Sequence, residues 1–217
     1  MDVPAHIQFR RHTRLTGFDY RRCVAYFVTI CVRNRECVFG SIKNDAVSLS
    51  RRGIVARDRW LDIPNHHAHV ELDDFVIMPN HMHGVLLFVG DIPNGSRVEA
   101  TPASRPSLAT GPMSGSLGAV VGSYKASVTR TINRLRRGAG ANLWQPNYYD
   151  HIIRNDHSRD RIRDYINENP LRWALDAENP SGNGSDDLEA FIRSLCDSPL
   201  RGDRDAGVAP TGEVFDV

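Results

Sequence analysis

The residues best suited to chemistry are two histidines in the segment Pro79-Asn80-His81-Met82-His83, which lies between two β-like runs, 75–78 and 85–89. In an extended chain His81 and His83 share one face, about 7 Å apart, and Met82 points to the other. Two imidazoles on one strand can chelate a metal ion and leave coordination positions free, as a catalytic metal requires. The same pair could also be two histidines at a hairpin mouth without a metal, because so short a motif is not specific alone.

A second candidate pair, Tyr165 and Asn169, shares a helical face because the two residues are four apart. An Asn oxygen can join two imidazoles on a metal, and the tyrosine would then lie beside the group that the metal polarises. Tyrosine is a covalent nucleophile in some enzymes. Its pKa near 10 makes activation necessary, and a phosphate bound to a divalent cation is a natural target. The alternatives are a helix C-cap before Pro170 for Asn169 and simple packing for Tyr165.

Extended elements must position the histidines. Residues 25–32 are β-branched and aromatic, which predicts a strand buried on both faces. A turn over 33–36 and a short edge over 37–40 follow. Residues 70–78 and 81–89 are two further strands, and Pro79-Asn80 between them is either a tight turn or a bulge. A final strand or extended segment covers 143–153.

Helices are predicted between and after these strands. Ser50 caps a helix over 51–63 that Pro64 ends, with Ile54, Trp60 and Leu61 facing the core. Residues 117–137 have the clearest helical spacing, and Gly138 ends that helix. Its expected apolar positions are Leu117, Val120, Val121, Tyr124, Val128, Ile132 and Leu135.

The site helix is expected over 159–169, capped by Ser158 or Asp156 and closed by Pro170. A short helix around 188–195 is a further candidate. The order of strands and helices predicts an α+β domain with a mainly antiparallel sheet of ferredoxin-like type, flanked by helices. We divide the chain into a basic N-terminal arm (1–24), a domain (25–175) with a flexible loop (90–116), and an acidic, largely disordered tail (176–217).

The charge distribution favours a polyanionic partner. The net charge is +1, but residues 176–217 carry −7, which leaves about +8 on residues 1–175. No Asp or Glu occurs from residue 105 to residue 149. A basic body suits nucleic acid, although an ordinary solvated surface has the same composition. The candidate phosphate contacts are Arg10, Arg11 and Arg14 of the arm, and Lys125, Arg130, Arg134 and Arg137 of the predicted helix.

Aromatic residues of the last extended segment are the candidates for base stacking. Trp144, Tyr148 and Tyr149 could stack on unpaired bases, or could belong to the core. The four cysteines form no Cys-x-x-Cys pair, and no apolar run approaches the length of a membrane span. We therefore expect a reduced, cytoplasmic protein without a membrane partner.

Several segments together resemble the REP-associated tyrosine transposases, which belong to the single-tyrosine HUH transposases related to IS200. The matching segments are Gly17-Phe-Asp-Tyr20, Tyr26-Phe-Val-Thr-Ile-Cys31, Asn34-Arg-Glu-Cys37, Phe39-Gly40, Phe75-Val-Ile-Met-Pro-Asn-His-Met-His83, Trp144-Gln-Pro-Asn-Tyr-Tyr-Asp-His-Ile-Ile153, Tyr165-Ile-Asn-Glu-Asn-Pro170 and Trp173. They cover roughly residues 10–175 in the expected order. The set is specific, whereas the His-x-His motif alone is not.

The resemblance implies a ferredoxin-like or RRM-like fold and a role for each site residue. His81 and His83 match the metal ligands, Tyr165 matches the nucleophile, and Asn169 matches the residue that completes the metal site. Insertion-sequence relatives usually carry Gln where this chain has Asn169. The metal would be Mg²⁺ or Mn²⁺, and two nitrogens with one amide oxygen suit Mn²⁺ at least as well. The long 90–116 loop and the acidic tail depart from the family pattern.

The implied activity is cleavage and strand transfer of single-stranded DNA at REP-type hairpins through a 5′-phosphotyrosine. A domesticated hairpin-binding protein that no longer cleaves is the alternative, and a metal hydrolase without a covalent tyrosine is a third. A nucleoid-associated cytoplasmic location would follow from DNA binding. The sequence leaves open a monomer or a homodimer, the DNA sequence that is recognised, and a mobile-element or a host role.

Overall fold

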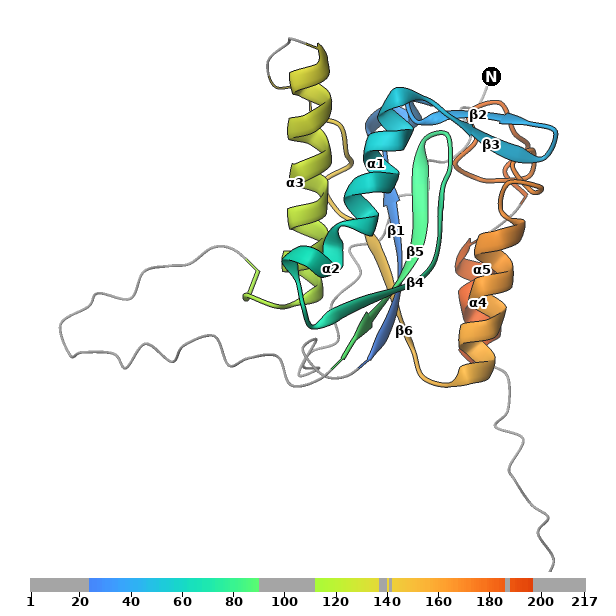
Figure 1. The fold of residues 1–217 in the computed structure, drawn as a ribbon. Coiled ribbons are helices and arrows are strands. Elements are labelled where there is room, and N and C mark those ends of the chain that lie inside the picture. Colours follow the sequence, from blue (N-terminus) through green and yellow to red (C-terminus); the bar gives the residue numbers. More distant parts are fainter. Residues whose placement is uncertain (1–23, 90–111, 137–139, 141, 186–187, 197–217) are drawn as a thin grey trace, which may run out of the picture.

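The computed structural model describes residues 24–89, 112–136, 140, 142–185 and 188–196 (Figure 1). The predictions for the basic arm, for most of the 90–116 loop, for Arg137 and Gly138 and for the end of the tail lie outside these residues. The described part is an α+β unit in which helices cover both faces of an antiparallel sheet. The predicted fold class is therefore confirmed.

The sheet has four strands in the order β4-β5-β1-β6, and every neighbouring pair is antiparallel. The strands are β1 (Ala25–Cys31), β4 (Val70–Ile77), β5 (His81–Phe88) and β6 (Tyr149–Ile153). One helical segment separates β1 from β4 and another separates β5 from β6. This is the β-α-β-β-α-β order of a ferredoxin-like domain. The central strands β1 and β5 are buried along almost their whole length, as their apolar, β-branched composition predicts.

One face of the sheet is covered by α1 (Arg51–Leu61), the short α2 (Ile63–His66) and α3 (Leu117–Arg136). The Ser50 hydroxyl caps α1, as predicted, by accepting from the backbone N–H groups of Arg52 and Gly53. Pro64 does not end the helical segment but stands in the first turn of α2, where its missing N–H costs nothing.

Three residues expected in the core are exposed instead, namely Ile54, Leu61 and Leu135. The buried face of α1 is made by Gly53, Ala56 and Trp60. Small residues bring the α1 backbone close to its neighbours, since a Cβ at Gly53 would meet the Phe39 carbonyl oxygen. Hydrophobicity alone predicted that Ile54 and Leu61 would be buried, but the close approach at Gly53 decides which face of α1 packs against the core.

The other face of the sheet carries α4 (Asp156–Glu168) and α5 (Leu188–Cys196) (Figure 1). Helix α4 starts three residues earlier than expected, and its cap is Asn155 rather than Ser158 or Asp156. The Asn155 side chain accepts from the backbone N–H of Ser158. The short helix expected around 188–195 is confirmed as α5. Residues 176–185 are also part of the folded unit, so the expectation of a largely disordered tail is wrong for them. Ile192 and Leu195 bury the apolar face of α5 beside Tyr165.

A two-stranded hairpin was missed by the sequence analysis. Strands β2 (Gly40–Lys43) and β3 (Ala46–Leu49) pair with each other outside the main sheet. Asn44 and Asp45 between them both have positive φ, as a tight two-residue hairpin turn requires. Before the hairpin, the turn expected over 33–36 forms a single 3-10 turn, η1 (Arg33–Arg35).

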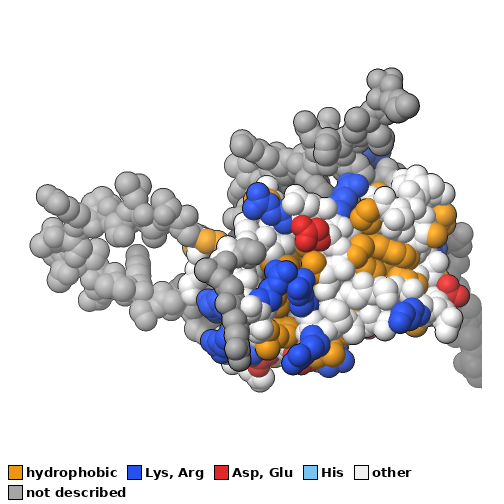
Figure 2. All heavy atoms as spheres, turned by 90° about the horizontal axis from the view of Figure 1, so that it is seen from above, with side chains coloured by type: hydrophobic (Ala, Val, Ile, Leu, Met, Phe, Trp, Pro, Cys, Tyr) orange, Lys and Arg blue, Asp and Glu red, His pale blue; other side chains and the backbone are white. Residues whose placement is uncertain are grey.

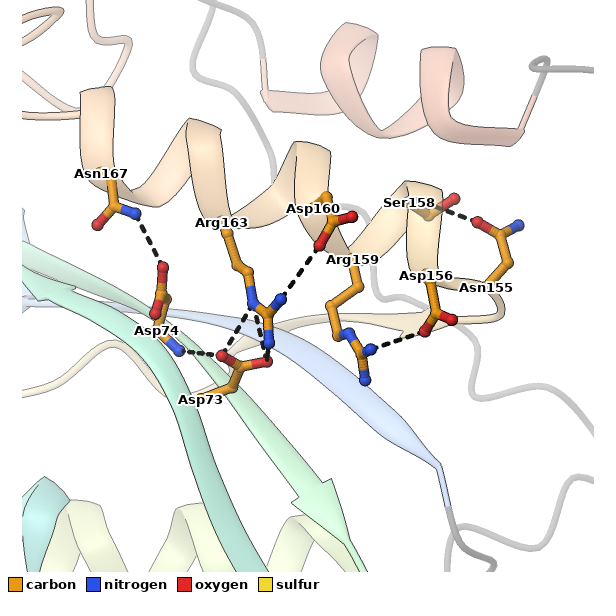
Figure 3. A network of polar contacts seen from close by, with 9 residues as sticks. All are labelled: Asp73, Asp74, Asn155, Asp156, Ser158, Arg159, Asp160, Arg163 and Asn167. Carbon is orange, nitrogen blue, oxygen red and sulfur yellow. Dashed lines mark hydrogen bonds and ion pairs between the residues drawn. The ribbon is translucent and has the colours of Figure 1, made fainter.

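The structure decides between a turn and a bulge at Pro79-Asn80. The Met78 N–H donates to the His81 carbonyl at 2.9 Å, so the segment is a tight turn. The bulge lies earlier, in β4, where the register with β5 shifts between Leu72 and Phe75. The extra residue there lets the chain present the carboxylates of Asp73 and Asp74 to α4 (Figure 3).

These two carboxylates hold α4 against the sheet edge. Arg163 of α4 makes a forked contact with Asp73, from Nε to Oδ1 at 3.0 Å and from Nη2 to Oδ2 at 2.8 Å. One helical turn later, Asn167 donates to Asp74 at 2.8 Å. Figure 3 shows both contacts along the same side of the helix. Because α4 carries Tyr165 and Asn169, this network fixes the height and rotation of the candidate site residues.

Asp73→Ala is expected to lower the free energy of unfolding by about 1–2 kcal/mol, because it leaves the Arg163 fork without its main partner. Urea denaturation measures this change. Asp156→Ala is the matched control, since that carboxylate is 86% exposed and pairs with Arg159. An exposed pair of this kind contributes about 0–1 kcal/mol. Equal effects of the two substitutions would show that the Arg163 contact does not hold α4.

Candidate metal and tyrosine site

The register of the sheet places both histidines on the face that α4 covers. Pairing of β5 with β1 sets His81 opposite Cys31 and His83 opposite Thr29. The intervening Met82 packs in the core on the other face, as expected. His81 is fully buried and His83 is 2% exposed.

Hydrogen bonds orient the two imidazoles. The Asn80 side-chain nitrogen donates to the backbone oxygens of Arg35 (3.0 Å) and Glu178 (2.6 Å). Asn80 Oδ1 is therefore the atom 2.9 Å from His81 Nδ1, and it accepts the Nδ1 proton. The Thr29 hydroxyl lies 2.8 Å from His83 Nδ1. Each ring is thus held through Nδ1, which is how proteins orient metal-binding histidines that ligate through Nε2.

The remaining ring nitrogens face each other, with His81 Nε2 and His83 Nε2 3.1 Å apart. Since His81 carries its proton on Nδ1, its Nε2 presents a lone pair to this gap. Metal–nitrogen bonds of about 2.1 Å place two ligands at right angles about 3 Å apart. The pair therefore fits a cation held between the two nitrogens. A proton carried by His83 Nε2 would satisfy the same contact.

Helix α4 brings Tyr165 and Asn169 to the same place. The Tyr165 ring lies beside His83 (centroids 5.4 Å apart) and edge-on to Phe27. Phe191 of α5 stacks on it at 4.4 Å, so α5 covers the tyrosine. Asn169 is both the C-cap of α4 and a site residue, 1% exposed. Its Oδ1 is buried and has no hydrogen-bond partner among the described residues. A buried oxygen of this kind is suited to be a metal ligand.

Burial sets the protonation of the histidines. Desolvation lowers the pKa of His83 well below its usual range, and the neighbouring His81 lowers it further. Desolvation also lowers the pKa of His81, while the Asp176 carboxylate and the nearby Asn169 amide act in the opposite direction. Both rings are therefore neutral near pH 7, which is the form that binds metal.

The metal-free protein is expected to lose stability as the pH falls below about 6.5. Unfolded histidines take up protons there while the buried pair resists protonation, so each ring changes stability by up to about 1.4 kcal/mol per pH unit. The contribution of the neutral histidines to the free energy of unfolding is therefore fully present above pH 6.5. It is lost as the pH falls from 6.5 toward the pKa values of the histidines in the folded protein. Urea denaturation from pH 7.5 to 5 should show a shallower loss for His83→Asn than for the exposed control His157→Asn. The same slope in both variants would contradict the pKa direction.

Sequence analysis missed several residues that line this site. Thr29, Asn80, Trp173 and Asp176 contact or flank the histidines, and Phe27 packs under His83. Alternation along the 25–32 strand could have placed Phe27 and Thr29 on one face, since these residues are two apart. Asp176 had no such signal, because it fell in the segment assigned to the tail.

The structure separates the expected DNA-binding residues. Trp144 is 2% exposed, packs against Phe39 and Tyr124, and belongs to the core, so its surface is closed to base stacking. The Lys125 amine donates to three backbone oxygens of residues 145–147 and thereby fixes the segment before β6. Burial lowers the pKa of Lys125 to about 8.

The two remaining tyrosines lie on different faces. Tyr149 pairs with Thr29 and packs in the core beside Tyr165, whereas the half-buried Tyr148 packs against the opposite core. Arg130 and Arg134 are exposed on α3, on the sheet face opposite to the histidines. Figure 2 shows that Lys and Arg side chains outnumber acidic ones on the face of the molecule seen there.

The described residues hold neither a metal-binding cluster of acidic, histidine and cysteine side chains nor a membrane-spanning helix. They contain no cluster of three or more His, Cys, Asp and Glu side chains arranged to hold a metal ion. A site at the histidine pair would accordingly need the Asn169 amide as well. Among the same residues, no helix combines the length and the apolar character that crossing a bilayer requires.

The chain is similar to known proteins in sequence and in structure. No protein-family model matches the chain. An uncharacterized protein of Haemophilus influenzae is 36% identical over 174 residues, which are 79% of this chain and 94% of that protein.

The solved structures are more distant. One, a REP-associated tyrosine transposase bound to a REP hairpin, has 18% identity and a TM-score of 0.49 over 92% of each chain. A proposed transposase of Deinococcus radiodurans has 20% identity and a TM-score of 0.38, over 70% of this chain and 94% of that one. At these scores neither likeness carries an argument about function.

Proposed function

Since the chain belongs to the same protein family as the Haemophilus influenzae protein, and its motifs resemble the REP-associated tyrosine transposases, we propose that it cleaves and rejoins single-stranded DNA. The observation that carries this proposal is the convergence of four residues from two distant segments. His81 and His83 point their Nε2 atoms at one gap, and Tyr165 and Asn169 lie at the same place. The bound metal would be Mg²⁺ or Mn²⁺, held by the two imidazoles and the Asn169 oxygen.

The reaction follows from the chemistry of these groups. The Tyr165 oxygen attacks the phosphorus of a DNA phosphodiester and loses its proton. The bond from phosphorus to the 3′-oxygen breaks, and that oxygen takes up a proton as a free 3′-hydroxyl. The DNA downstream of the break is then joined to the protein as a 5′-phosphotyrosine. Attack by another 3′-hydroxyl reverses the step and completes strand transfer. A divalent cation supplies Lewis-acid stabilisation of the phosphate charge.

The substrate class is a REP-type DNA hairpin with a single-stranded flank. The exposed Arg130 and Arg134 of α3 and the basic arm with Arg10, Arg11 and Arg14 are the proposed backbone contacts. A cytoplasmic, nucleoid-associated location is part of the same proposal. The alternative functions are hairpin binding without cleavage and metal-dependent hydrolysis that releases free ends.

A denaturing gel with end-labelled hairpin DNA and Mn²⁺ distinguishes the three. With a 3′ label, covalent cleavage moves the label into a protein-sized band that protease removes. With a 5′ label, the same reaction yields a short free product. Binding without either product supports the non-cleaving alternative. Two free fragments without a protein-linked band support hydrolysis, and either of these results rejects the tyrosine mechanism.

A further inference from the structure

A buried carboxylate lies beside the histidine pair. Asp176 is 7% exposed, and its Oδ2 is 3.6 Å from His81 Nε2, the nitrogen that faces the gap. The residue follows α4 in the chain, seven positions after Asn169. The proposed metal ligands at the gap are two imidazoles and one amide, and all three are neutral. The Asp176 carboxylate lies beside this neutral set, within 3.6 Å of His81 Nε2.

Several contacts hold this carboxylate in place. Asp176 Oδ1 accepts from the Glu178 N–H at 2.6 Å, which leaves Oδ2 directed at His81. The Glu178 carbonyl accepts from Asn80, the residue that orients His81. The Glu178 carboxylate also lies 3.3 Å from Arg35 Nε. The turn after α4, the β4–β5 turn and η1 are therefore tied together at this point, and the position of Asp176 is built into the fold.

The charge of Asp176 acts on three buried ionisable groups. Burial is the largest influence on the pKa of His81, which it lowers, and on the pKa of Glu178 and of Cys31, which it raises; the Asp176 charge acts upward on all three. A site with this potential attracts positive charge. Burial strengthens the effect because little water screens it.

We propose that Asp176 is a positioning residue of the metal site. The three ligands of the divalent cation are neutral, and the Asp176 carboxylate beside them supplies the negative charge that they lack. The inference rests on the proposed function, since it assumes that a cation binds between His81 and His83. Outer partners of this kind typically contribute 10–100-fold to metal affinity.

Titration of the metal-free protein with Mn²⁺, followed by calorimetry, tests the inference without reference to DNA cleavage. Asp176→Asn removes the charge but keeps an oxygen for the Glu178 N–H, so the turn should survive. We expect at least tenfold weaker Mn²⁺ binding and an unchanged melting temperature in the absence of metal. Glu168→Gln is the matched control, because it removes a half-exposed carboxylate near the same end of α4, and its affinity should change less than about twofold.

The outcomes separate this inference from the proposed function. Wild-type binding of Mn²⁺ with an unchanged affinity in Asp176→Asn overturns the role of Asp176 and leaves the proposed function intact. Absence of Mn²⁺ binding by the wild type overturns both. Should Asp176→Asn fail to fold, Asp176→Ser decides the same question, since its hydroxyl can also accept from Glu178.

Discussion

Tyr165→Phe is expected to abolish the covalent protein–DNA product, with a loss of at least about a thousandfold in cleavage rate, while Mn²⁺ binding stays close to wild type. The substitution removes one oxygen and keeps the ring that packs against Phe27, His83 and Phe191. The fold should therefore survive. A nucleophile that forms the covalent intermediate has no substitute once its oxygen is gone. Labelled hairpin DNA and denaturing electrophoresis measure the product, and calorimetry measures the metal.

Tyr149 and Tyr148 are the controls for this experiment, and they lie on opposite faces of the sheet. Tyr149 lies on the histidine face of the sheet, opposite Thr29, and is the only other candidate nucleophile there among the tyrosines of the described residues. Tyr148 packs toward the other core. We expect both Tyr149→Phe and Tyr148→Phe to form the covalent band. A band that persists in Tyr165→Phe and disappears in Tyr149→Phe would assign the nucleophile to Tyr149.

Local periodicity could predict each half of the site, but not that the two halves meet, which only the family resemblance implied. Alternation along a strand puts His81 and His83 on one face, and a spacing of four puts Tyr165 and Asn169 on one side of a helix. The structure brings both pairs to the same face of the sheet. Periodicity could not give the 3.1 Å between the two Nε2 atoms, because ring orientation depends on Thr29 and Asn80.

Features that depend on long-range packing were not predictable in the same way. The α1 helix buries Gly53 rather than Ile54 because the Phe39 backbone approaches too closely there for a side chain, a condition that hydropathy does not report. Asp176 reaches the site from a segment whose Asn, Gly, Ser and Asp content is typical of disorder, and Phe191 from a candidate helix whose packing partner the sequence did not indicate. Their positions depend on contacts with η1, the β4–β5 turn and Tyr165.

The arrangement also limits how DNA can lie on the protein. Helix α3 packs with Met82 on one face of the sheet, and the histidines lie on the other. Arg130 and Arg134 are therefore separated from the proposed scissile phosphate by the sheet itself. If these arginines bind DNA, they bind a part of the hairpin that reaches around a sheet edge. Their substitution should weaken hairpin binding and its salt dependence and leave Mn²⁺ affinity unchanged.

His83→Asn is expected to weaken Mn²⁺ binding by more than about a hundredfold, beyond the usual effect of an outer partner. The shorter Asn amide can still hydrogen-bond with Thr29, but it cannot reach the position of the His83 Nε2 that faces His81. Cleavage at low Mn²⁺ should be lost together with metal binding. Calorimetry and the hairpin gel measure the two effects, and His157→Asn on the exposed side of α4 is the control for the same change of residue type.

The dependence on metal concentration separates a ligand from a nucleophile. Weaker binding is overcome by mass action, so raising Mn²⁺ should restore part of the cleavage by His83→Asn. No concentration of Mn²⁺ should restore Tyr165→Phe, because its missing atom forms a bond in the product. Wild-type Mn²⁺ affinity in His83→Asn would show that the two imidazoles share a proton rather than a metal ion. The 3.1 Å contact between them would then be a structural hydrogen bond in the core.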